Sequence, residues 1–80
     1  MNKILEFVRE INPDVPDSEE LDLISEGYID SFGVFSIVVR IELNFDVIVR
    51  EEEMTYDNFR SIHDIKNLLI SKGVEESKLL

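Results

Sequence analysis

The 80-residue chain has no cysteine, only one histidine, two prolines and three glycines. Without cysteine it can form neither a disulfide nor a thiolate zinc site, so the fold must rest on packing alone. No calcium-loop pattern, glycine-rich phosphate loop or pair of nucleophile and base is present. We therefore expect no catalytic residue and no metal site, and we interpret the protein as not being an enzyme.

Long apolar runs are also lacking. No run approaches the ~20 residues that a membrane-spanning helix needs, and the first residues do not have the pattern of a signal peptide. We expect a cytoplasmic protein with no membrane insertion. The length fits one small domain, which we place at residues 1–73, followed by a flexible C-terminal tail over residues 74–80.

Basic residues are scarce: eight stand against eighteen acidic ones, and the formal net charge is -10. Such a field repels the phosphates of nucleic acids and favours encounter with basic patches on protein partners. We therefore expect a monomer that binds proteins and does not bind nucleic acid.

Two segments have the apolar spacing of amphipathic helices. The first covers residues 2–11 and stops before Pro13, because the residue preceding a proline is disfavoured in the helical region. The last begins after Ser61, a candidate N-cap followed three positions later by an acidic residue, and ends at the C-cap Gly73.

The segments between these helices contain a long connection and a short helix. The connection, residues 15–30, has too many apolar residues for a free linker, so we expect it to pack on the core. Gly27 supplies a turn within it. Residues 54–59 favour one or two helical turns with Thr55 as the N-cap and Phe59 as an anchor.

Residues 31–49 fit two structures. Alternating apolar and β-branched residues, with a turn at residues 44–46, slightly favour a β-hairpin. A helical face is also present, formed by Val34, Val38, Ile41 and Phe45. Local propensity does not decide between the hairpin and the helix.

Ser31 is the candidate functional residue. If a helix begins here, free backbone N–H groups and the positive end of the helix dipole make this position a good seat for a phosphate. Two other roles stay open: Ser31 could simply cap the helix, or Asp30 could be the cap while Ser31 occupies the first turn.

The stretch 22–33, which contains Asp30-Ser31-Phe32, resembles the motif of acyl carrier proteins. The similarity continues through Phe45-Asp46 and residues 58–62, so that it covers roughly residues 2–72. The resemblance implies an all-α fold, a small four-helix bundle with a long first loop and a short third helix. It thereby favours a helix over the hairpin for the segment after Ser31.

The resemblance also implies a function. In the family, a phosphopantetheinyl transferase attaches 4′-phosphopantetheine from coenzyme A to the serine, here Ser31, and Asp30 would support this modification. The arm would hold an acyl or aminoacyl group as a thioester. An adenylating acyl or amino-acid ligase would load it, and a downstream acyltransferase or synthase would unload it. The alternative is an acidic helical interaction domain that is never modified.

The residues after Ser31 depart from the pattern of fatty-acid carriers, which usually have acidic residues on this face of the second helix. The face is more similar to carriers of the D-alanyl type and to stand-alone carriers of specialised pathways. Glu42 falls where family members often have an acidic residue. We expect a partner-binding surface, with Leu43 nearby, formed by Phe32, Gly33, Phe35, Ser36, Val39 and Glu42.

Overall fold

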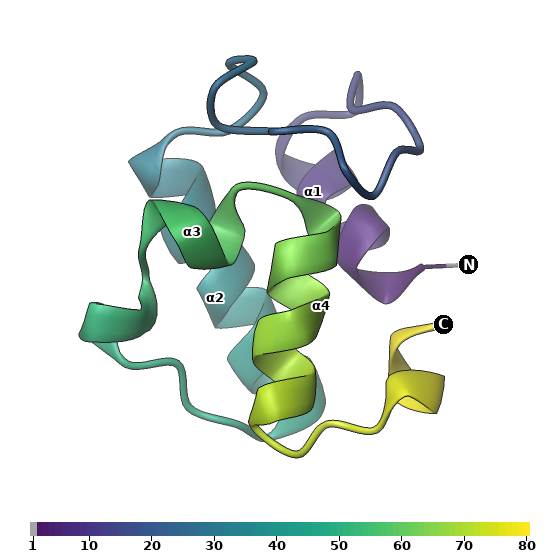
Figure 1. The fold of residues 1–80 in the computed structure, drawn as a ribbon, viewed down its shortest axis with the longest axis vertical. Helices are drawn as coiled ribbons and strands as arrows, with labels where there is room; N and C mark the ends of the chain where they lie inside the picture. The colour runs from purple at the N-terminus through teal and green to yellow at the C-terminus, as the bar shows by residue number, and fades with distance from the viewer. Residues whose placement is uncertain (1) are drawn as a thin grey trace.

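The protein is a small bundle of α-helices, seen here in a computed structural model that describes residues 2–80 (Figure 1). No strand occurs in this part of the chain, and none of its helices is long and apolar enough to cross a membrane. The predicted four-helix bundle is confirmed. Its elements are α1 (Lys3–Ile11), α2 (Ser31–Phe45), η1 (Glu51–Glu53), α3 (Tyr56–Phe59), α4 (Ile62–Ser71) and η2 (Glu76–Leu79), where η marks a 3₁₀ turn.

One apolar core joins the helices. Each long helix turns an aliphatic stripe inward, and the single turn of α3 inserts Phe59, which is fully buried. Burial of this apolar surface is the main force that holds so short a chain together. The largest fully buried side chains are those of Ile4, Leu23, Ile37, Ile41, Phe59, Ile62, Ile65 and Leu69.

Side-chain caps begin α3 and α4 at the two residues that the sequence predicts. Thr55 Oγ1 accepts a hydrogen bond from the N–H of Asn58, and Ser61 Oγ accepts one from the N–H of Asp64. Asn2 caps α1 in the same way. Each cap satisfies a backbone donor that the helix itself leaves unpaired, so short local signals fix where α3 and α4 start.

The hairpin alternative for residues 31–49 is wrong, because Ser31–Phe45 form α2, the longest helix of the described chain. Asp46 ends this helix in the left-handed conformation, with φ of 54°. The N–H of Val49 then donates to Glu42 Oε2 at 3.0 Å instead of to a neighbouring strand.

The connection before α2 packs on the core, as predicted. Leu23 and Ile29 are buried, and Gly27 turns the chain with φ of 81°. Two backbone hydrogen bonds tie this connection to the C-terminal half: the N–H of Leu23 donates to the carbonyl of Arg60 at 2.6 Å, and the N–H of His63 donates to that of Glu19 at 2.9 Å.

The C-terminal residues correct an expectation. We predicted a flexible tail over residues 74–80, but Val74 and Leu79 are buried and η2 contacts α1. An ion pair between Lys66 Nζ and Glu76 Oε1, 3.1 Å apart, holds the same segment to α4. In Figure 1 the chain accordingly returns from the end of α4 to lie beside α1.

Substitution of Leu79 tests this packing. Leu79→Ala should lower the free energy of unfolding by about 2 to 4 kcal/mol, because it removes a buried side chain and leaves a cavity. Leu80→Ala is the matched control, since Leu80 is exposed, and it should change stability by less than about 0.5 kcal/mol. Urea denaturation followed by circular dichroism measures both, and equal stabilities of the two variants would contradict the packed arrangement.

Candidate functional site

Ser31 is the first residue of α2, and its side chain is exposed. The cap of this helix is Asp30, whose Oδ1 accepts a hydrogen bond from the N–H of Gly33 at 2.8 Å. Of the alternatives left open by the sequence, the one with Asp30 as the cap and Ser31 in the first turn is therefore correct. The Ser31 hydroxyl lies at the positive end of the α2 dipole without serving as its cap.

Gly33 lies where the loop crosses the start of α2. A Cβ on this residue would lie 3.2 Å from Ile29 Cβ and 3.6 Å from Ile11 Cγ2, so the site has almost no room for a side chain. Gly33 is buried and cannot contribute a side chain to a surface, contrary to its predicted place in the partner-binding set. Its role is to let the loop approach the helix closely.

A hollow of about 470 Å³ opens beside Ser31. Ile24 contributes from the loop and Val34 from α2, while the segment leading into α3 supplies the opposite side. Most of this lining is apolar, with hydroxyl groups and one carboxylate among it. The lining residues are Ile24, Ser31, Val34, Glu51, Met54, Thr55 and Tyr56.

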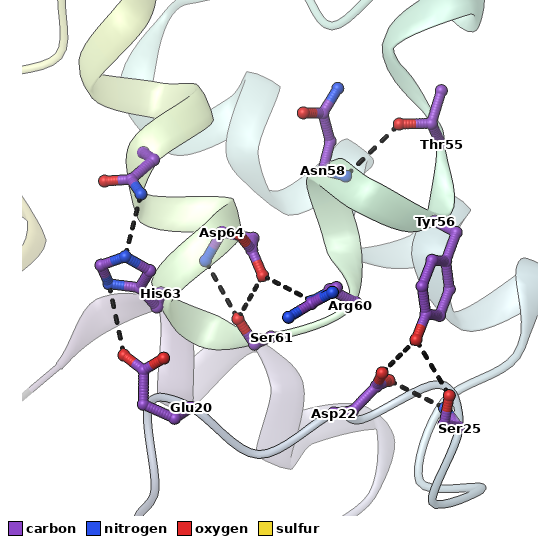
Figure 2. A network of polar contacts seen from close by, with 11 residues as sticks. Glu20, Asp22, Ser25, Thr55, Tyr56, Asn58, Arg60, Ser61, His63 and Asp64 are labelled. Atoms are coloured by element: carbon purple, nitrogen blue, oxygen red, sulfur yellow. Dashed lines mark hydrogen bonds and ion pairs between the residues drawn. The ribbon is translucent and has the colours of Figure 1, made fainter.

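A polar cluster near this hollow joins the loop before α2 to α3, and Figure 2 shows Tyr56 directed toward Asp22 and Ser25. Tyr56 Oη donates a hydrogen bond to the Asp22 carboxylate and lies 3.0 Å from Ser25 Oγ. The N–H of Ser25 also donates to Asp22 Oδ1 at 2.9 Å. The hydrogen bond from Tyr56, followed by that from the Ser25 backbone, lowers the pKa of Asp22 below its ordinary value.

Sequence analysis did not find this cluster. Asp22 and Tyr56 are 34 positions apart, and neither belongs to a motif that would indicate the contact. We name the three residues Asp22, Ser25 and Tyr56 the loop–α3 clamp.

The exposed face of α2 retains most of the predicted partner-binding residues. Phe32, Phe35 and Val39 are exposed, and Ser36 is half-buried. Glu42 differs from the expectation, because it is half-buried and accepts the hydrogen bond from the N–H of Val49 that anchors the chain after α2.

His63 belongs to a separate polar group at the start of α4 (Figure 2). Its Nε2 lies 3.1 Å from Asn67 Nδ2, and its Nδ1 lies 3.6 Å from Glu20 Oε1. Within residues 2–80, no group of three histidine, aspartate or glutamate side chains is placed to hold a metal ion.

The fold and this site define a class of protein: a small acidic helical bundle that displays a serine at the exposed start of its longest helix, as carrier proteins do. Comparison of the sequence with those of known proteins identifies the class more closely. The chain is 29% identical over 69 residues to the D-alanyl carrier protein of Bacillus subtilis (strain 168), and the match covers 84% of this chain and 88% of that protein.

Two further relatives carry similar names. The D-alanyl carrier protein of Streptococcus sanguinis (strain SK36) is 30% identical over 64 residues, and the match covers 79% of this chain and 81% of that protein. Aminoacyl carrier protein 2 of Bradyrhizobium diazoefficiens is 28% identical over 78 residues, and the match covers 89% of this chain and 83% of that protein. The chain therefore belongs to the carrier protein family. No protein-family model and no solved structure matched it.

The start of α2 yields a first prediction about the site. Asp30→Ala should lower the free energy of unfolding by about 1 kcal/mol, because the N–H of Gly33 loses its partner. Ser31→Ala should change it by less than about 0.5 kcal/mol, since Ser31 is not the cap. Chemical denaturation of both variants is the measurement; a loss from Ser31→Ala as large as that from Asp30→Ala would contradict the assignment.

The loop–α3 clamp yields a prediction about pH. Since the pKa of Asp22 is lower in the folded chain than in the unfolded one, its contribution to stability is present above the unfolded pKa of about 4 and is lost as pH falls through the folded value. The stability difference between wild type and Tyr56→Phe should therefore be constant near neutral pH and shrink in acid. Carboxyl NMR titration should give a higher Asp22 pKa in Tyr56→Phe; an unchanged pKa would refute the clamp.

Proposed function

We propose that the protein carries an acyl or aminoacyl group as a thioester on a 4′-phosphopantetheine arm attached to Ser31, and presents this cargo to the enzymes of a specialised biosynthetic pathway. One observation carries the proposal: in a chain of the carrier family, Ser31 stands exposed at the first position of α2, while its neighbour Asp30 provides the cap. The hydroxyl is thus available for modification without loss of the helix start.

The residues around Ser31 fit a phosphodiester. The backbone N–H groups of the first turn of α2 and the positive end of its dipole favour a negative group at this position. No acidic side chain lies within the first turn of the helix itself. Asp30 uses Oδ1 for the cap, and the same carboxylate is the one that would support the modification.

The hollow beside Ser31 fits the rest of the arm. Its size lies within the range of small-molecule sites in proteins. Apolar side chains such as Val34 and Met54 match the methylene and methyl groups of pantetheine. The hydroxyl of Thr55, which only accepts a hydrogen bond in its capping role, can donate to an amide carbonyl of the arm. When present, the arm supplies the thiol that forms the thioester, which the cysteine-free chain lacks.

The remaining assignments follow from the carrier role. The chain supplies attachment and presentation, and its partners perform the chemistry: a phosphopantetheinyl transferase, an adenylating acyl or amino-acid ligase, and a downstream acyltransferase or synthase. The names of the relatives, D-alanyl and aminoacyl carrier proteins, support an amino acid as cargo. We place this activity in the cytoplasm and assign it to a monomer.

Modification in vitro tests the attachment site. Incubation with coenzyme A and a broad-specificity phosphopantetheinyl transferase should increase the intact mass of the wild type by one phosphopantetheinyl group, because Ser31 is exposed. Ser31→Ala should stay unmodified, whereas the exposed control Ser18→Ala should behave as wild type. Modification of Ser31→Ala would show that a residue other than Ser31 is the attachment site. An unmodified wild type would favour the alternative, an acidic helical interaction domain.

A further inference from the structure

The hollow beside Ser31 has one charged group in its lining, the carboxylate of Glu51. The other lining side chains are apolar or carry hydroxyls, and none of the basic side chains of residues 2–80 belongs to them. The Glu51 side chain is exposed, and no ion pair within the same part of the chain involves it. A carboxylate without a counter-ion therefore borders a hollow that is otherwise uncharged.

The 3₁₀ turn η1, Glu51–Glu53, is held in place by the last of its three glutamates. Glu53 Oε1 accepts hydrogen bonds from Lys72 Nζ, at the end of α4, at 2.6 Å and from the N–H of Arg50 at 2.9 Å. These hydrogen bonds, that from Lys72 foremost, lower the pKa of Glu53 below its ordinary value. Glu53 thus anchors the turn, while Glu51 borders the hollow and Glu52 is exposed outside its lining.

The two other carboxylates close to this site already have partners. Asp30 caps α2 through Oδ1, and Asp22 accepts the hydrogen bonds of the loop–α3 clamp. Each of them therefore serves the fold. Glu51 is the carboxylate at the hollow that is available to a positively charged ligand.

We propose that Glu51 determines the specificity for the cargo: its carboxylate binds the α-ammonium of an aminoacyl group held on the arm of Ser31. The proposal rests on the carrier function proposed above and selects an amino acid from its two kinds of cargo. An ammonium and a carboxylate form charge-assisted hydrogen bonds, which are stronger than those between neutral groups. The arm keeps its cargo close to the hollow, so a weak contact is enough to hold the amine there.

Two other kinds of cargo fit the hollow less well. An acyl group with a free carboxylate would place a second negative charge beside Glu51, and like charges in contact are unfavourable. A purely apolar acyl group would cover the Glu51 carboxylate without replacing the hydrogen bonds that water gives it. An amino acid supplies both an opposite charge for Glu51 and a side chain for the apolar lining.

Titration of the cargo amine tests the proposal. An alanyl-coenzyme A analogue with an amide in place of the thioester is a stable probe, and a broad-specificity phosphopantetheinyl transferase should attach its ¹⁵N-labelled alanyl arm to Ser31. A nearby carboxylate favours the charged amine, so NMR titration should give an amine pKa about 0.3 lower in Glu51→Gln than in wild type. The matched control is Glu52→Gln, which removes the same charge from the same turn and should lower this pKa by less than about 0.1.

A second probe removes the ammonium instead of the carboxylate. The propionyl analogue has a hydrogen where the alanyl analogue has its amine, and is otherwise the same. The alanyl arm should shift the backbone N–H resonance of Glu51 in the wild type, whereas the propionyl arm should leave this resonance where the unacylated arm leaves it. The Glu51→Gln variant should show no such difference between the two arms.

Each outcome separates the two proposals. Equal changes of the amine pKa in Glu51→Gln and Glu52→Gln, or equal resonance shifts from the alanyl and propionyl arms, would overturn the ammonium site at Glu51 while the carrier function stands. An intact mass showing that neither coenzyme A nor its analogues modify the wild type would overturn both.

Discussion

Two carboxylates accept hydrogen bonds from backbone N–H groups at the two ends of α2, the helix that positions Ser31, the hollow and the exposed apolar face. Asp30 holds the N–H of Gly33 at the start of α2, and Glu42 holds the N–H of Val49 after its end. The first contact determines where the helix begins and hence that Ser31 is displayed in its first turn. The second returns the chain toward η1 and α3, which form the far side of the hollow. The two contacts thus mark the ends of the helix that carries the serine, while the buried apolar side chains of α2 hold it against the rest of the bundle.

Local signals in the sequence were enough to predict most of the fold. The caps at Thr55 and Ser61 and the turn at Gly27 each depend on residues within a few positions, so the sequence alone predicts them. Contacts between distant residues were not predictable. The pairing of Tyr56 with Asp22 and the burial of Leu79 depend on how the helices assemble, and no nearby residue indicates them.

The helix that carries Ser31 was the hardest element to predict, and its two faces explain why. Its inward face is buried in the core at Ile37 and Ile41, while its outward face carries the exposed residues from Phe32 to Leu43. A helix with apolar residues on both its inward and its outward face shows only a weak period of 3.6, and its β-branched residues add a false strand signal. The exposed apolar face of α2, which we assign to partner binding, is therefore also the reason why the secondary structure of this segment was hard to predict.

The contrast between a neutral α2 and an acidic remainder also governs how the protein behaves as a solute. Carboxylates elsewhere on the surface keep molecules apart at neutral pH, while the exposed aromatic side chains of α2 are indifferent to pH. The sequence isoelectric point is near 4.3, and around it the repulsion vanishes but the apolar face remains. Acidification thus brings the protein to its solubility minimum while the apolar side chains of α2 stay exposed, so the acidic composition is what keeps this face in solution at neutral pH.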